Sequence, residues 1–293
     1  MGDKPKLGYL GLGLMGSQMT KRLVENGYTV TGFDPDPEKM AAARANGVVP
    51  AATPADVTRA SDIVEACVIT TPALTEAMFG PDGVAEGAAA DKIFLDHSTT
   101  IADKTRDMAA RLKEQSGMGW VDAPVSGGPP SAGTGKLAIM VGGTDADVAA
   151  VKPILDVLGN NTHMGPSGAG QVTKMVNQVL VLNNFCLLAE AATLAKNAGI
   201  DPAMVPEALS GGYADSPMFR QFFSRYLERD FEPAGYARQV LKDLDMIVDL
   251  AQQTRTPVPL SSQSTNLYRM LIAKGHSELD AVAILKIYDD ETL

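Results

Sequence analysis

Positive charge, cysteine and histidine are all scarce in this chain. Asp and Glu outnumber Lys and Arg by 35 to 25, so the chain lacks the basic excess that binds nucleic acid or anionic membranes. Its two cysteines, Cys67 and Cys186, each lie in an apolar run, which indicates buried free thiols rather than a disulfide or a metal pair. With only three histidines besides, we expect no metal site.

A secretory leader and a membrane span are also absent from the pattern. Glycine-rich sequence begins soon after Met1, where a leader would carry an apolar run. The apolar stretch from Val179 to Leu188 is interrupted by Asn183 and Asn184 and is too short to cross a bilayer. We therefore predict a cytoplasmic protein that has no membrane partner.

A glycine-rich turn between two apolar runs is the first motif that is present. Lys6 to Leu10 leads directly into Gly11-Leu12-Gly13-Leu14-Met15-Gly16, then a helical pattern and the apolar run Thr29 to Phe33. In such a turn the first glycine allows the bend, the second admits a pyrophosphate, and the third lets helix and strand pack closely. The helix N-terminus offers its free N–H groups to the phosphates. We predict that residues 11–16 bind a dinucleotide.

Asp34 ends the second apolar run, roughly 20 residues beyond the glycines. A carboxylate at this point accepts hydrogen bonds from the ribose hydroxyls of NAD and repels the 2′-phosphate of NADP. Pro35 to Glu38 adds negative charge, and no arginine follows closely. We predict NAD as the cofactor. The alternative interpretation, a solvated acid at a strand end, leaves NADP open.

Strand and helix patterns alternate through the rest of the first half. This alternation predicts an α/β fold, a mostly parallel doubly wound sheet with helices on both faces. Ligands of such sheets bind beyond the carboxyl ends of the strands. The residues at those ends are Thr71, Pro72, Ser98, Thr99 and Ser126-Gly127-Gly128. The backbone N–H groups of the last three are unobstructed, which suits a carboxylate or phosphate, although a flexible connection is the alternative.

A long helix is predicted over 168–198, between a glycine-rich lead-in and Gly199. It is apolar on more than one face, so we expect it to be buried. Near its start lies Lys174, with Asn177 three residues on and Gln178 four residues on, all on one side. A lysine in such a helix either has a function or extends its amine to solvent along an apolar stem.

Only helical patterns follow that helix. We predict a doubly wound α/β domain over 1–165 and an all-helical domain over 166–293 that begins with the long helix. A long apolar helix needs a cover, so we also expect a homodimer or homotetramer.

Three motifs in this order resemble the β-hydroxyacid dehydrogenases, the group of 3-hydroxyisobutyrate dehydrogenase, tartronate semialdehyde reductase and glyoxylate/succinic semialdehyde reductase. GYLGLGLMGSQM is similar to the cofactor signature. Asp122 to Gly128, continued by Gly135-Lys136-Leu137, is similar to the substrate signature, and Gly168 to Asn177 is similar to the catalytic signature. Leu241-Lys242-Asp243-Leu244 is similar to a C-terminal K-D-L segment. The resemblance covers essentially the whole chain.

The resemblance implies a role for each matching residue. Lys174 matches the catalytic lysine, and Asn177 or Gln178 matches the amide that places the substrate. Ser126, Gly127 and Gly128 match the loop that holds the substrate carboxylate. Thr71, Pro72 and Thr99 match positions that line the nicotinamide end of the cofactor, the nicotinamide side of the site. Lys242 matches a lysine near the closed active site. Without the resemblance, the local sequence suggests instead a solvated lysine that pairs with Asp245.

Two departures leave parts of the site open. Relatives often carry an asparagine four residues after the lysine, where this chain has Gln178. The segment Phe231 to Tyr236 replaces the usual P-G-F, which leaves the wall of the substrate pocket unassigned.

These motifs predict hydride transfer between NAD and a small 3-hydroxy acid of the 3-hydroxyisobutyrate type. Partial burial and the nicotinium charge disfavour protonated Lys174, so its pKa falls toward the working pH and it can exchange the hydroxyl proton. Tartronate, glyoxylate or succinic semialdehyde is the alternative substrate. A histidine-based dehydrogenase and a 6-phosphogluconate-type decarboxylase lack their motifs here. A non-catalytic dinucleotide-binding scaffold would be expected to have lost Lys174.

Overall fold

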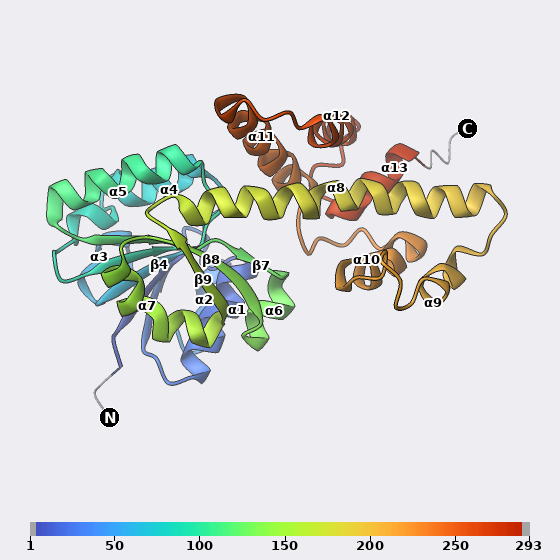
Figure 1. Ribbon diagram of the computed structural model, residues 1–293. Coiled ribbons are helices and arrows are strands. Elements are labelled where there is room, and N and C mark those ends of the chain that lie inside the picture. The colour runs from blue at the N-terminus through green and yellow to red at the C-terminus, as the bar shows by residue number, and fades with distance from the viewer. Residues whose placement is uncertain (1–3, 289–293) are drawn as a thin grey trace. The chain divides into compact units, whose positions relative to one another are not determined.

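The computed structural model describes residues 4–288, and the chain divides into two compact units (Figure 1). Unit 1 is Met1–Lys174 and unit 2 is Met175–Leu293. Helix α8, Ala169–Asn197, belongs to both units. The boundary placed at 165/166 from the sequence precedes α8, whereas the units divide inside it. The reason is that the first turn of α8 is hydrogen-bonded to the sheet of unit 1 through Asp122.

Unit 1 is built on a sheet with the parallel order β3-β2-β1-β4-β5-β6, which confirms the predicted doubly wound α/β fold. β8 pairs antiparallel with β6 and β7 and parallel with β9. The central strands β1, β4 and β6 are buried at every position, as expected where helices cover both faces. The strands are β1 Leu7–Leu10, β2 Val30–Phe33, β3 Val49–Pro50, β4 Ile63–Ala66, β5 Ile93–Asp96, β6 Gly119–Asp122, β7 Val125–Ser126, β8 Leu137–Gly142 and β9 Gly159–Gly165.

Each face of this sheet carries its own apolar core. One core includes Met19 of α1, Ala43 of α2, Ala132 of α6 and Leu155 of α7. The other includes side chains of α3, α4 and α5, with α4 and α5 lying together over one face in Figure 1. The helices are α1 Leu14–Glu25, α2 Pro37–Ala45, α3 Pro54–Arg59, α4 Thr71–Phe79, α5 Ala102–Ser116, α6 Gly128–Thr134 and α7 Asp145–Leu158, with a 3-10 turn η1 at Val84–Glu86.

The connection from β4 to α4 is tighter than the sequence suggested. The apolar run predicts a strand as far as Thr70, but β4 ends at Ala66. Thr70 instead caps α4, its side chain accepting the N–H of Ala73, and Pro72 suits the first turn. As a result α4 begins at Thr71. Thr71 and Pro72 thus lie at a helix N-terminus that faces the carboxyl edge of the sheet.

Unit 2 is helical throughout its described residues, which contain no strand and only an isolated bridge between Tyr236 and Asp280. Its core joins Phe185 of α8, Phe223 of α10, Leu244 of α11 and Tyr268 of α12. The helices after α8 are η2 Pro202–Met204, α9 Val205–Ala208, α10 Pro217–Glu228, α11 Ala237–Thr254, α12 Pro259–Ala273, η3 Ala281–Ile284 and α13 Leu285–Tyr288.

Helix α8 is not buried all round, contrary to the expectation from its apolar faces. Four large apolar side chains on it are exposed by half or more: Val176, Leu180, Leu187 and Leu194. By length and composition alone α8 could also cross a bilayer. Its opposite face supplies core residues of unit 2, and Asn183 hydrogen-bonds there to Ser261 and Ser264. Helix α8 is therefore a core helix of unit 2 on one face and carries an exposed apolar stripe on another.

Candidate active site

The glycine-rich turn after β1 has the geometry that a dinucleotide requires. Gly11 has φ +87°, and a Cβ on Gly16 would lie 2.0 Å from the carbonyl oxygen of Gly11. A Cβ on Gly13 would meet nothing within 4 Å, so the turn is open on that side. Gly13 is also the N-cap of α1, and no side chain occupies the N–H groups of that helix end. These groups are therefore available to a pyrophosphate, and the residues present fit the predicted cofactor.

Asp34 is hydrogen-bonded to the glycine-rich turn. Its Oδ2 accepts the N–H of Leu12 at 2.8 Å, and its Oδ1 accepts the N–H of Asp36 at 2.9 Å. Each oxygen keeps a second lone pair for a ribose hydroxyl. Lys39, which no sequence motif marks, also lies here: its Nζ is 3.8 Å from Asp34 Oδ1 and 3.3 Å from Asp36 Oδ2. A cation therefore stands beside the carboxylate and softens its repulsion of a 2′-phosphate.

Two strand-end loops meet at the predicted nicotinamide side. The N–H of Val68, after β4, donates to Ser98 Oγ at 2.9 Å. The N–H of Ile101 donates to Thr71 Oγ1 at 3.1 Å. Thr71 is thereby linked to the loop after β5 that contains Thr99. The sequence placed both threonines at strand ends, and the fold brings their loops together.

The Ser126-Gly127-Gly128 loop is a defined turn rather than a flexible connection. Ser126 ends β7 and pairs with Ala138 of β8. Gly127 and Gly128 have φ +128° and +70°, values that other residues rarely adopt, and α6 begins at Gly128. A short strand therefore holds the loop on one side and a helix holds it on the other.

Lys174 lies against this loop. Only 6% of the residue is exposed, and its Nζ donates to the carbonyl oxygen of Val125 at 2.8 Å. Val125 directly precedes Ser126, so the predicted catalytic amine and the predicted carboxylate loop are neighbours. The alternative in which Lys174 extends to solvent does not match this burial.

Two buried side chains that the sequence interpretation did not assign hold the first turn of α8. Asp122 Oδ1 accepts the N–H of Gly168 at 2.7 Å, and its Oδ2 accepts the N–H of Gln171 at 3.1 Å. Burial raises the pKa of Asp122, although these N–H groups oppose the shift. The amide of Gln171 bonds to the loop after β5, at Ser98 and Thr100. Both residues fall inside the recognised motifs, but motif spacing does not reveal what they contact.

In unit 2 the two candidate amides belong to one polar chain. Asn177 Nδ2 donates to Gln178 Oε1 at 2.8 Å, and Gln178 Nε2 donates to Asp243 Oδ2 at 2.5 Å. Lys242 Nζ forms an ion pair with Asp243 Oδ1 at 2.9 Å. Asp245 forms an ion pair with Arg269. Gln178 has thus used both ends of its amide within the protein, whereas the oxygen of Asn177 remains for another donor.

His97 is enclosed at the carboxyl edge of the sheet. It is 2% exposed, its Nδ1 lies 3.0 Å from the carbonyl oxygen of Ala123, and its Nε2 lies 3.0 Å from Glu65. Both ring nitrogens are therefore engaged inside the protein. Beside it, burial raises the pKa of Asp96 to about 7. This arrangement disfavours His97 as the acid–base group of a histidine-based dehydrogenase.

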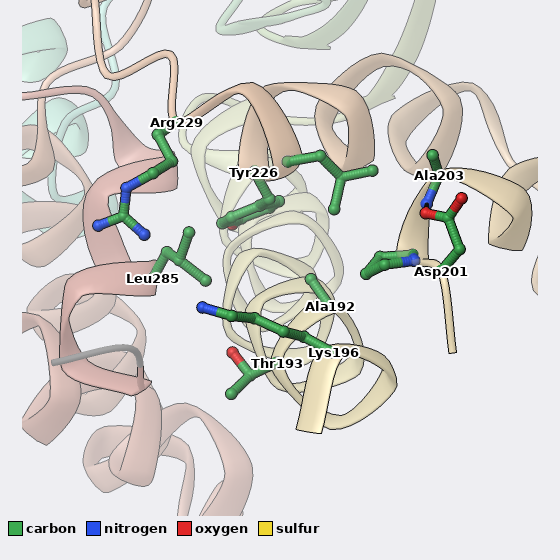
Figure 2. A pocket seen from close by; sticks show the side chains of 10 residues that line it. Ala192, Thr193, Lys196, Asp201, Ala203, Tyr226, Arg229 and Leu285 are labelled. Atoms are coloured by element: carbon green, nitrogen blue, oxygen red, sulfur yellow. Dashed lines mark hydrogen bonds between the residues drawn. The ribbon is translucent and has the colours of Figure 1, made fainter. Parts of the chain in front are cut away.

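A cavity of about 310 Å³ lies within unit 2, away from every predicted site residue (Figure 2). Its wall combines apolar side chains such as Tyr226 and Leu285 with the charged residues Lys196, Asp201 and Arg229. Figure 2 shows the Lys196 side chain extending toward Leu285. Neither the cofactor motif nor the lysine motif contributes to this cavity, so we do not place the chemistry there.

Two family models together match nearly the whole chain. Residues 6–168 match the NAD binding domain of 6-phosphogluconate dehydrogenase. Residues 168–288 match the NAD-binding domain of NADP-dependent 3-hydroxyisobutyrate dehydrogenase.

Individual proteins match along the same length. The chain is 35% identical to 2-hydroxy-3-oxopropionate reductase of Escherichia coli K12 over 284 residues, which is 96% of each chain. It matches the crystal structure of 3-hydroxyisobutyrate dehydrogenase from Salmonella typhimurium with a TM-score of 0.89 and 27% identity, covering 97% of this chain and 100% of the other. The Mycobacterium tuberculosis 3-hydroxyisobutyrate dehydrogenase, solved with L-serine, gives a TM-score of 0.85 and 28% identity, covering 98% and 99%.

Proposed function

Because the chain belongs to the β-hydroxyacid dehydrogenase family and is an NAD(P)-dependent hydroxy acid dehydrogenase, we propose that Lys174 is its general acid–base group and a small 3-hydroxy acid its substrate. The observation that carries this proposal is the bond from Lys174 Nζ to the carbonyl oxygen of Val125. It puts an amine next to a turn, residues 126–128, whose backbone can receive a carboxylate. In a 3-hydroxy acid the carboxylate and the hydroxyl are close together. The turn can therefore bind the carboxylate while the neighbouring amine meets the hydroxyl.

Each residue of the proposed site either binds the substrate or exchanges a proton with it. Ser126 to Gly128 bind the substrate carboxylate and so direct the hydroxyl at C3 toward Lys174. In oxidation the O–H bond of that hydroxyl breaks, its proton passes to the unprotonated amine, and a carbonyl forms as the C3–H bond breaks. In reduction Lys174 returns the proton to the carbonyl oxygen. Bound NAD(P) supplies the hydride acceptor or donor.

The contacts in unit 2 favour Asn177 over Gln178 as the working amide. Gln178 donates to Asp243 and accepts from Asn177, so each end of its amide already has one partner inside the protein. Asn177, three residues after Lys174 in the same helix, retains a carbonyl oxygen that a substrate hydroxyl can meet. We propose that Gln178 and Asp243 hold Asn177 in place.

The substrate class and the cofactor preference are tested by one kinetic screen. We propose 3-hydroxyisobutyrate as the preferred type, with tartronate semialdehyde as the second candidate because a 35% identical relative is named for that reduction. We expect oxidation of 3-hydroxyisobutyrate or L-serine, or reduction of the semialdehyde, with kcat/KM at least about tenfold higher for NAD(H) than for NADP(H), which corresponds to about 1.4 kcal/mol. No turnover of any 3-hydroxy acid or semialdehyde would contradict the function. A preference for NADP would contradict the role given to Asp34.

We also propose that the chain forms a homodimer or homotetramer. The support is the exposed stripe of α8, whose four residues recur at spacings of four and seven and so share one face of the helix. Light scattering on the purified protein should give at least twice the chain mass, and Leu180→Glu combined with Leu187→Glu should reduce it. A wild-type protein that is monomeric at micromolar concentration would refute this.

A further inference from the structure

We propose that Gln171 is a positioning residue that holds Lys174 in register with the loop on the nicotinamide side. This inference rests on the proposed function, since it assumes that Lys174 exchanges the substrate proton. It concerns a residue that touches neither substrate nor cofactor and acts through the two segments that it joins.

The amide of Gln171 pairs with the backbone on both sides of Thr99. Its Nε2 donates to the carbonyl oxygen of Ser98 at 2.8 Å, and its Oε1 accepts the N–H of Thr100 at 3.0 Å. Gln171 has no exposed surface, so water cannot replace either bond without entering the core. A two-point amide pair fixes both the distance and the orientation of the loop relative to α8.

Gln171 stands three residues before Lys174 in the same helix, so the two side chains share a face. The backbone N–H of Gln171 is held at Asp122, and Lys174 Nζ is held at Val125. Asp122 and Val125 belong to the segment that leads into the substrate loop. The side chain of Gln171 therefore connects the start of α8, and with it the segment from Asp122 to Val125, to the loop containing Thr99. Hydride transfer needs the substrate and the nicotinamide to be held in a reactive orientation, and misplacement by about 1 Å can cost about 100-fold in rate.

Two substitutions separate positioning from simple packing. Gln171→Met keeps the volume and removes both hydrogen bonds. Gln171→Glu keeps both bonds only while the acid is protonated, because its O–H can then donate to Ser98 and its carbonyl can accept from Thr100. The ionised form offers two acceptors and places one against the carbonyl oxygen of Ser98. Burial favours the protonated form, so Gln171→Glu should work at low pH and fail as the pH rises.

The first readout uses the protein without substrate or cofactor. Hydrogen exchange at the Thr100 amide should be faster in Gln171→Met than in wild type at every pH. In Gln171→Glu it should match wild type near pH 6 and approach Gln171→Met near pH 9. Wild type measured at the same pH corrects for the intrinsic pH dependence of exchange.

The second readout is steady-state kinetics on the substrate found in the screen. For Gln171→Met we expect kcat to fall about 10- to 100-fold, with KM for substrate and for NAD within about threefold of wild type. For Gln171→Glu, the ratio of its kcat to that of wild type should fall by about tenfold or more between pH 6 and pH 9. Leu155→Ala, on the buried face of α7, is the control for lost stability, and it should lower the thermal midpoint without changing kcat of the folded enzyme.

Three results would overturn the proposal. One is wild-type kcat in Gln171→Met despite faster exchange at Thr100, since the tether would then exist without a kinetic role. Another is a kcat loss in Gln171→Met that Leu155→Ala reproduces at an equal loss of stability. The third is unchanged exchange at Thr100. Failure of the proposed function itself would look different, because Lys174→Met would stay active or the screen would find no substrate while the exchange result still stood.

Discussion

Lys174→Met reduces kcat/KM by about 100- to 10,000-fold while the protein stays folded and binds NAD(P). The loss is of this size because the substitution removes the proposed general acid–base group, whose contribution is typically in that range. Methionine is as long as the lysine stem and apolar, so the buried site is filled at the cost of the bond to Val125. A change in the free energy of unfolding of about 1–2 kcal/mol is therefore expected. Initial rates with the preferred substrate, thermal unfolding and NAD(P) titration measure the three quantities.

Lys196→Met is the matched control for this substitution. Lys196 is on the same helix, is exposed and lines the cavity of unit 2 rather than the motif-bearing loops. Its replacement should leave kcat/KM within about twofold of wild type. A Lys174→Met enzyme that kept more than a tenth of wild-type activity would remove the lysine from the mechanism, and the hydroxyl proton would need another acceptor.

Gly13→Val weakens cofactor binding without unfolding the protein, whereas Gly16→Ala lowers both cofactor binding and stability. A side chain at residue 13 meets nothing within 4 Å, so the fold accommodates it and loses about 1 kcal/mol at the N-cap. The same side chain occupies the space through which a pyrophosphate approaches the backbone, so we expect the Kd for NAD to rise at least tenfold. Isothermal titration and thermal unfolding of the same samples give both values.

Gly16→Ala has the opposite steric situation. Its Cβ would lie 2.0 Å from the carbonyl oxygen of Gly11, so α1 must move away from the turn. We expect a loss of about 3 kcal/mol in the free energy of unfolding, together with weaker NAD binding. If Gly13→Val and Gly16→Ala lowered stability equally, or if Gly13→Val bound NAD normally, the turn would not be the pyrophosphate site.

Local chemistry made much of the first unit predictable. Apolar runs that are buried on both faces, a glycine turn and a following helix can be read from neighbouring residues, and β1, α1 and β2 formed where the pattern placed them. The cofactor turn, Asp34 and the lysine helix could be proposed as candidates for the same reason, because each motif is contained within one short segment. The predicted strand end at Thr70 was wrong, since Thr70 serves as a helix cap instead.

The partners of individual side chains could not be read in this way, whether they lie near or far along the chain. Asp34 accepts the N–H groups of Leu12 and Asp36, and Lys39 stands beside it, so we expect it to repel NADP less than its charge alone suggested. The pairing of Gln178 with Asp243 joins residues from two helices, and it favours Asn177 as the working amide, a choice that helical spacing left open.

By itself the sequence determined the class of the protein: a dinucleotide turn, a small-residue loop and a lysine helix, each defined by local backbone and side-chain chemistry. The tertiary structure alone decided what holds these parts in register. Asp122 and Gln171 join the start of α8 to two strand-end loops, and Val125 receives the amine of Lys174. Hydrogen bonds between segments far apart in the chain have no period or spacing in the sequence, so only the folded chain reveals them.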